Sequence, residues 1–285
     1  MFGFGQLIDI LKKHPRKIVF TEGSDPRILE ASSRLLASTF LAPVLVGNKE
    51  EIAKAAEESG FNIRGAEIID PLNYDEIDEM VDMLCEIRKN KGMTPEQARG
   101  ILSQANYFGT MLVKMGKADA LLGGATYSTA DTVRPALQII KTKPGCKLVS
   151  AFFLMEVPDC DLGSNGTFVF ADCGLNQNPN PEELAAIAES SAESYRMLTG
   201  NEPRVAMLSH SSKGSAKHAD VDKVVEATRI AKEANPDLAL DGELQLDAAI
   251  VPSVGASKAP DSKVAGKANV LIFPDLDAGN IGYKL

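Results

Sequence analysis

The stretch GGATYSTADTVRPALQIIKTK, residues 123–143, joins a short apolar run to a helical pattern. The apolar run before it, residues 118–122, predicts a buried strand, and the two glycines end that strand. Proline is tolerated in the first turn of a helix, where its missing N–H would have no partner. Pro135 therefore predicts a helix that begins near Asp131 or Thr132, which gives a strand–turn–helix unit of an α/β fold.

The hydroxyls and the arginine of this stretch are typical of an anion site. Ser128 and Thr129 are expected in the loop just before the helix N-terminus, where free N–H groups and the helix dipole attract anions. Arg134 adds a full charge and a planar donor fork that matches phosphate oxygens. An ordinary capped helix with a solvated arginine explains the same residues, and both interpretations stay open on spacing alone.

Strand and helix patterns alternate along the rest of the chain, which predicts α/β architecture with largely parallel sheets. At 285 residues there is room for about two domains, and the Pro, Gly and Lys residues of 141–147 suggest a boundary. We expect domains at 1–143 and 144–285. The expected strands are 17–20, 43–47, 67–70, 118–122, 148–157, 166–171, 204–208, 238–241 and 268–273.

Composition excludes several classes of protein. A net charge of −9 gives no bulk attraction for nucleic acid or an anionic membrane, so a phosphate group needs a local basic site. No targeting segment is visible, and the longest apolar run, 148–155, is too short to span a bilayer and predicts a buried strand. With four dispersed cysteines, no CxxC pair and three histidines, we expect free thiols in the cytoplasm and no zinc site.

Three polar loops follow strands of the second half, where ligands bind in open α/β sheets. The loop 209–217 contains Ser212, and its hydroxyls and lysines suit either a phosphate group or ordinary solvation. The loop 252–267 carries Lys258 and Lys263 and is long enough to suggest a function. The loop 274–280 contains Asn280 and two aspartates.

Four further residues have competing interpretations. Asp275 and Asp277 could bind a divalent ion, but without a clear third ligand we expect capping or loop bonding and no metal site. Cys160 lies between two aspartates, which disfavour a reactive thiolate. Arg88 lies at a predicted helix C-terminus, where a cation complements the dipole.

Six stretches of the chain closely resemble the phosphate acetyl/butyryltransferase family. They are IRKNKGMT (87–94), DTVRPALQIIKTK (131–143), VPDCDLGSNGTFVFAD (157–172), AMLSHSSKGSAK (206–217), DGELQLDAAIVPSVGASKAP (241–260) and VAGKANVLIFPDLDAGNIGYKL (264–285). The resemblance implies a fold similar to that of isocitrate and isopropylmalate dehydrogenases, with an active-site cleft between two domains.

The resemblance also implies an activity. Acetyl-CoA and phosphate are converted reversibly to acetyl phosphate and CoA in a ternary complex, without a covalent acetyl-enzyme and without a cofactor, since CoA is a substrate. A base removes the thiol proton of CoA, and the thiolate attacks the acetyl carbonyl. The family implies a cytoplasmic homodimer.

Individual residues match the family pattern. Arg134 and Arg88 match active-site arginines, which settles the interpretation of Arg88 in favour of a functional role. The other expected substrate-binding residues are Ser128, Thr129, Thr132, Cys160, Ser212, Lys258, Lys263 and Asn280. Cys160 is expected near CoA without taking part in the chemistry.

The family pattern continues past Leu285 with a Ser–Arg pair and the proposed catalytic Asp. We therefore expect a C-terminally truncated chain, whose first domain would be completed by the missing helices and which is inactive without them. Alternatives are phosphate butyryltransferase or another short-acyl specificity, a non-catalytic CoA- or phosphoester-binding module, and, last, a metal-dependent hydroxy-acid dehydrogenase.

Overall fold

The computed structural model of the chain describes residues 5–146 and 148–285, apart from the side chain of Gln6. The chain divides into two compact units, and the division falls between Lys141 and Thr142. The first unit ends two residues before the boundary expected after Lys143, and the assignment of domains stays a prediction.

The first unit contains a four-stranded parallel sheet with the strand order β3-β2-β1-β4. Its elements are α1 (Gly5–Lys13), β1 (Arg16–Phe20), α2 (Pro26–Ser38), β2 (Leu41–Val46), α3 (Lys49–Ser59), β3 (Glu67–Ile69), the 3-10 turn η1 (Pro71–Asn73), α4 (Ile77–Ile87), the 3-10 turn η2 (Lys89–Lys91), α5 (Pro95–Leu102), α6 (Ala105–Lys114), β4 (Ala120–Leu122), α7 (Thr129–Pro135) and the π-helical turn η3 (Ala136–Ile140).

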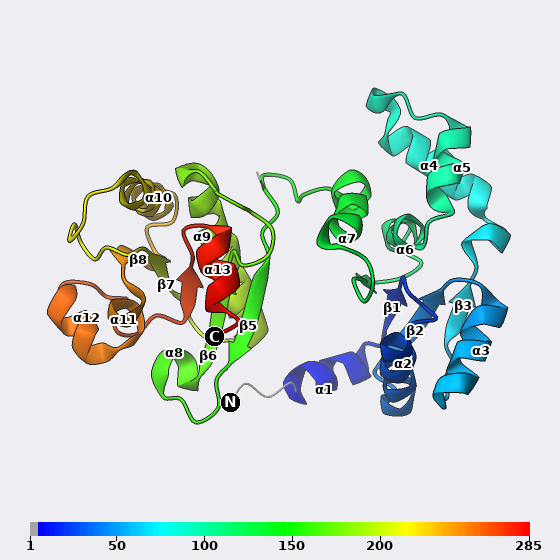
Figure 1. Cartoon of the computed structure of the whole chain (residues 1–285), viewed down its shortest axis with the longest axis horizontal. Helices are drawn as coiled ribbons and strands as arrows, with labels where there is room; N and C mark the ends of the chain where they lie inside the picture. Colours follow the sequence, from blue (N-terminus) through cyan, green and yellow to red (C-terminus); the bar gives the residue numbers. More distant parts are fainter. Residues whose placement is uncertain (1–4, 147) are drawn as a thin grey trace. The chain divides into compact units, whose positions relative to one another are not determined.

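Successive side chains of each strand point to opposite faces of the sheet, and this divides the core of the unit into two layers. Val19 and Val44 pack with side chains of α4, α5 and α6 on one face of the sheet. Phe20 and Leu45 point the other way and pack against α2 and α3. The helices of Figure 1 accordingly lie on both sides of the sheet.

The second unit contains a five-stranded mixed sheet with the order β5-β6-β9-β7-β8, in which only the β5–β6 pair is antiparallel. Its elements are β5 (Phe152–Glu156), α8 (Leu162–Asn165), β6 (Thr167–Ala171), α9 (Pro181–Thr199), β7 (Arg204–Leu208), α10 (Ala219–Ala234), β8 (Ala239–Leu244), α11 (Leu246–Ile250), α12 (Pro252–Lys258), β9 (Val270–Ile272) and α13 (Leu276–Gly282).

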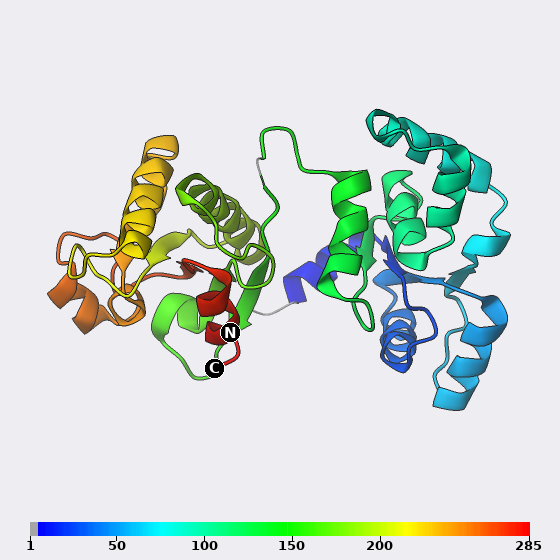
Figure 2. The same cartoon turned by 45° about the horizontal axis from the view of Figure 1, so that its top comes forward.

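This sheet is also covered on both faces. Val205 and Ile272 pack with side chains of α9 and α10 in one core cluster. Ala206 and Leu271 face the opposite way and pack with α11 and the chain that follows α12. The two views of this unit in Figures 1 and 2 show α10 and α11 on separate sides of the strands. The predicted α/β class with parallel-rich sheets and flanking helices is confirmed.

Two predicted buried strands are edge strands. β4 pairs only with β1, and the side chain of Leu122 is 52% exposed. In the sheet of the second unit, β5 is an edge strand that pairs with β6. Phe152 and Phe153 on β5 are each 36% exposed. Apolar character alone does not distinguish an edge strand from a central one, because an edge strand still covers the core on one face.

One element prediction in the second half was wrong. The strand expected at 238–241 is present as β8, which continues through Gly242 to Leu244. The expected loop 252–267 begins with the helix α12, for which Pro252 at the first position was an available start signal. Within residues 5–146 and 148–285, none of the helices has the length and apolar character needed to cross a membrane.

Candidate functional site

The candidate site of the first unit lies beyond the carboxyl ends of two neighbouring strands. β1 and β4 run in parallel, with Phe20 opposite Leu122. The chain therefore leaves both strands at the same edge of the sheet, and residues 21–25 lie close to residues 123–127. This is the edge at which open α/β sheets bind ligands.

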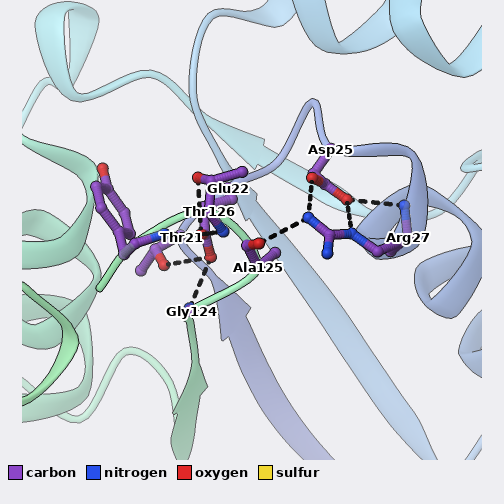
Figure 3. A network of polar contacts seen from close by, with 8 residues as sticks. Thr21, Glu22, Asp25, Arg27, Gly124, Ala125 and Thr126 are labelled. Atoms are coloured by element: carbon purple, nitrogen blue, oxygen red, sulfur yellow. Dashed lines mark hydrogen bonds and ion pairs between the residues drawn. The ribbon is translucent and has the colours of Figure 1, made fainter. Parts of the chain in front are cut away.

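Glu22 reaches from one of these segments to the other (Figure 3). Its carboxylate accepts hydrogen bonds from Gly124 N (2.9 Å), Tyr127 N (2.9 Å), Thr126 Oγ1 (3.0 Å) and Thr126 N. Burial alone would raise the pKa of Glu22, but the hydrogen bonds from Thr126 and Tyr127 outweigh it and hold the pKa below its ordinary value. Three backbone amides of the loop before α7 are thus bound by a carboxylate of the protein itself.

Ser128 caps α7, because its Oγ accepts a hydrogen bond from Asp131 N at 3.2 Å. The hydroxyl of Thr132 donates to Ser128 O at 3.1 Å. Thr129 is the first helical residue and is exposed. The structure therefore brings the three predicted hydroxyl residues together within one turn of helix.

The predicted start of this helix at Asp131 or Thr132 was wrong, since α7 begins at Thr129 and ends at Pro135. Proline has no N–H to give to the carbonyl four residues earlier, which is that of Asp131. Asn106 on α6 supplies the missing donor, because its Nδ2 donates to Asp131 O at 2.8 Å. This tertiary hydrogen bond explains why a proline is found in the last turn.

Arg134 consequently lies in the last turn of α7 and not at its start. Its side chain is 55% exposed, and Nη1 lies 3.6 Å from Asp131 Oδ1. Arg88 follows the last residue of α4, and its Nε is buried without a hydrogen-bond partner among the described residues. No hydrogen bond or ion pair of the described residues joins Arg88 to α7.

In the second unit, a buried glutamate holds the loop 209–217. Glu243 Oε1 accepts hydrogen bonds from Ser211 Oγ (2.8 Å) and Gly214 N (2.7 Å). Ser212 is buried, and its Oγ accepts from Gln245 N at 2.9 Å. The same Gln245 accepts from Ser212 Oγ (3.3 Å) and Lys258 Nζ (2.9 Å), so the structure brings Ser212 and Lys258 together.

Asp241 lies beside this loop and pairs with two lysines. Lys213 Nζ and Lys232 Nζ approach its Oδ1 at 2.6 and 2.7 Å. Burial would raise the pKa of Asp241, but the hydrogen bonds from Lys213, Lys232 and Ser262 lower it to about 2. Lys263 is exposed and lines a neighbouring cavity of about 420 Å³ that Asp241 also lines.

The remaining predicted residues of this unit lie apart from that cluster. Cys160 is half-buried in the segment between β5 and β6. Asn280 lies on α13, where its Nδ2 donates to Cys173 O at 3.3 Å. In the described part of the chain, no hydrogen bond joins either residue to Ser212 or Lys258.

The two aspartates after β9 do not form a metal site among the described residues, which contain no group of three or more His, Cys, Asp or Glu that could hold an ion. Asp275 caps α13 by accepting a hydrogen bond from Ala278 N at 2.9 Å, as the capping interpretation predicts.

Sequence reasoning missed the carboxylates that hold the two loops. Neither Glu22 nor Glu243 was among the predicted site residues. The available signal was their place, directly after β1 and inside β8, at the same sheet edges as the predicted ligand loops.

Comparison with known proteins identifies the family of the chain. The profile of the family described as "Phosphate acetyl/butaryl transferase" matches residues 4–285. A phosphate acetyltransferase of Thermoanaerobacterium thermosaccharolyticum is 56% identical over 279 residues, which cover 98% of this chain and 84% of that protein. One of Acetivibrio thermocellus is 52% identical over 280 residues, with the same two coverages of 98% and 84%.

A solved structure agrees with the sequence comparison. The crystal structure of a phosphotransacetylase from Streptococcus pyogenes matches with a TM-score of 0.91 and 50% identity, covering 99% of this chain and 84% of that chain. The profile match spans nearly the whole chain, and the sequence identity far exceeds what a shared fold alone requires. The chain therefore belongs to the phosphate acetyl/butyryl transferase family.

Proposed function

We propose that the protein is a phosphate acetyltransferase, an acyltransferase that interconverts acetyl-CoA and phosphate with acetyl phosphate and CoA. The observation that carries this proposal is the identity of 56% and 52% with two phosphate acetyltransferases over 98% of the chain. The first unit supplies hydroxyls and arginines suited to a phosphoryl group. The second unit supplies lysines suited to the phosphates of CoA.

Arg134 and Arg88 are the proposed ligands of the phosphoryl group. Phosphate brings negative charge to the reacting centre, and arginine offsets it with charge-assisted hydrogen bonds. Arg134 is exposed and only loosely paired with Asp131, so its donor fork is available. Arg88 Nε is buried without a described partner, and an anionic oxygen at that atom would satisfy it. Thr129 adds an exposed hydroxyl donor. The hydroxyls of Ser128 and Thr132 donate to Asp131 Oδ2 (2.6 Å) and Ser128 O (3.1 Å), and we propose that they turn to the phosphoryl group when it binds.

The second unit is proposed to bind CoA. Lys258 and Lys263 offer positive charge to its phosphates, and Ser212 is held beside Lys258 through Gln245. Cys160 and Asn280 are proposed contacts on the basis of the family resemblance. In the proposed reaction the CoA thiolate attacks the acetyl carbonyl in a ternary complex, and binding both substrates together lowers the barrier by proximity.

A butyryl or other short-acyl specificity is the nearest alternative, because the family profile covers both enzymes. The two compared relatives are acetyltransferases, and this favours acetyl. We also propose that the reaction needs no cofactor, that the protein is a homodimer, and that its fold is the one shared with isocitrate and isopropylmalate dehydrogenases. The free thiols of all four cysteines suit a cytoplasmic location.

The decisive experiment mixes the purified full-length protein with acetyl phosphate and CoA and follows the absorbance of the thioester. Butyryl phosphate in place of acetyl phosphate measures acyl specificity, and addition of EDTA tests for a metal requirement. Thioester formation with acetyl phosphate supports the proposal. CoA binding by calorimetry without thioester formation would instead identify a non-catalytic CoA-binding module.

A further inference from the structure

We propose that Glu22 is a positioning residue for the phosphoryl end of the site, holding residues 124–127 so that Ser128 and the rest of α7 meet the phosphoryl group in one fixed geometry. This inference rests on the proposed function, which places the phosphoryl group at α7.

The carboxylate of Glu22 accepts hydrogen bonds from three residues of the loop. Gly124 N donates to Oε2 at 2.9 Å, while Thr126 and Tyr127 donate to Oε1 through two backbone N–H groups and one hydroxyl. Figure 3 shows Gly124 and Thr126 beside the Glu22 carboxylate. A loop with so many of its donors bound to one side chain loses the conformational freedom that an unrestrained glycine-containing loop would have.

The same loop is also held through one of its carbonyl oxygens. Arg27 Nη2 donates to Ala125 O at 2.7 Å. The same guanidinium donates two hydrogen bonds to Asp25, from Nε to Oδ1 (2.9 Å) and from Nη2 to Oδ2 (2.8 Å). Donors and acceptors of the loop are therefore tied to residues 22–27, which follow the central strand β1.

The restraint continues directly into α7. Tyr127, bound by Glu22, is followed by Ser128, which caps the helix and accepts the hydrogen bond of Thr132 through its carbonyl. No unrestrained residue separates the carboxylate from the hydroxyls proposed to contact phosphate. A displacement of residues 124–127 would therefore move those hydroxyls as well.

The negative charge of Glu22 also indicates that its role is to position residues 124–127. A carboxylate near a phosphoryl site repels the ligand, so its charge opposes binding. Glutamine would keep the shape, but its NH₂ group would face a backbone N–H that needs an acceptor. Glutamate offers acceptors on both oxygens, which is what the inward-pointing donors of 124–127 require.

The test compares Glu22→Gln and Glu22→Ala with the matched control Glu30→Gln, which removes a carboxylate from an exposed ion pair with Arg34 on α2. We expect kcat/KM for acetyl phosphate to fall on the order of 10- to 100-fold in both Glu22 variants, the scale of a small misplacement of catalytic groups. The KM for CoA and the melting temperature of Glu22→Gln should stay near those of the wild type. The control should match the wild type throughout.

Amide hydrogen exchange of residues 123–129 gives a second readout. Faster exchange there in Glu22→Gln, with unchanged exchange in β1 and β4, supports the inference. Wild-type kinetics and wild-type exchange in Glu22→Gln would overturn it. Equal falls in kcat/KM for acetyl phosphate and for CoA, together with a lowered melting temperature, would also overturn it, because they would indicate a general loss of stability. If the wild type transfers no acetyl group, the proposed function fails separately, and the exchange measurement alone decides whether Glu22 orders the loop.

Discussion

Arg134 differs from most arginines of this protein in the looseness of its pairing. Its nearest carboxylate oxygen is 3.6 Å away, whereas Arg229 is paired with two glutamates at 2.6 Å each. A loosely paired guanidinium can turn its donor fork to a ligand without losing a strong hydrogen bond. The first prediction tests this availability.

In the full-length protein, Arg134→Lys should keep the charge and lose the paired donors. A hydrogen bond to a charged group is worth about 1.5–3 kcal/mol, which corresponds to a fall of about 10- to 150-fold in kcat/KM for acetyl phosphate or in phosphate affinity. Steady-state kinetics and calorimetry with phosphate measure it. The matched control is Arg99→Lys, on α5 of the same unit, where the arginine pairs with exposed Asp78. Wild-type values in Arg134→Lys would contradict the phosphoryl role.

In the full-length protein, Cys160→Ala should retain most of the turnover rate. The thiol lies between Asp159 and Asp161, and the proposed reaction needs no covalent acetyl-enzyme. A rise in the KM for CoA is compatible with a contact to that substrate. A fall of several orders of magnitude in kcat at saturating substrates would show that Cys160 is a nucleophile.

The sequence revealed the donors of the candidate site better than the groups that hold them. Ser128, Thr132 and Arg134 stand out because hydroxyls and arginine beside glycines form a short local pattern. Glu22 lies about a hundred residues away from the loop that it binds, and a glutamate in a turn is ordinarily solvated. Only the parallel pairing of β1 with β4 brings the two segments together.

At the scale of one element, α7 depends on a donor from outside the helix. Asn106 Nδ2 donates to the Asp131 carbonyl that Pro135 cannot serve. Asn106→Ala should lower the free energy of unfolding by about 1–2 kcal/mol, the cost of leaving a polar group without its hydrogen bond. Urea unfolding followed by circular dichroism measures this loss.

A double-mutant cycle with Pro135→Ala provides the control. Alanine at 135 restores an N–H that can donate to Asp131 O within the helix. The cost of Asn106→Ala should therefore be smaller in the Pro135→Ala background than in the wild type. Equal costs in the two backgrounds would show that Asn106 stabilises the unit through a different contact.

Long periodic elements were predictable, and short elements stabilised by packing were not. α9 has an Asn180–Glu183 capping box and ends at Gly200, so its bounds follow from local signals. α12 contains Gly255, at which a Cβ would lie 2.5 Å from Gly266 N. Its glycine-containing sequence resembles a loop, and close contact with a distant backbone segment gives the helix its place.

At the scale of the whole molecule, the two units use the same arrangement at their candidate ligand loops. Glu22 holds residues 124–127 in one unit, and Glu243 holds Ser211 and Gly214 in the other. In both cases a carboxylate that follows or ends a parallel strand binds the loop after the neighbouring strand. The hydroxyl-rich loops are therefore ordered by the scaffold rather than by their own composition.

The buried carboxylate of Asp241 makes the stability of the second unit dependent on acid pH. The pKa of Asp241 is lowered from 3.8 to about 2 by Lys213, Lys232 and Ser262, against the opposing effect of burial. A carboxyl group whose pKa is lower in the folded state stabilises the protein above its unfolded pKa and loses that effect as the pH falls through the folded pKa. The stabilisation should therefore be full above about pH 4 and mostly lost by about pH 2, and a shift of this size is worth about 2 kcal/mol.

Asp241→Asn isolates this contribution, because the variant cannot lose a charge at that position. The difference in unfolding free energy between wild type and Asp241→Asn should narrow by about 2 kcal/mol between pH 5 and pH 2. Amide hydrogen exchange of peptides from β7, β8 and α10 reports on the second unit alone, which matters because two units need not unfold as one. Asp237→Asn, an exposed aspartate on the turn before β8, is the matched control and should leave the pH dependence unchanged. A difference between wild type and Asp241→Asn that does not change with pH would show that the two lysines do not stabilise the charged form of Asp241.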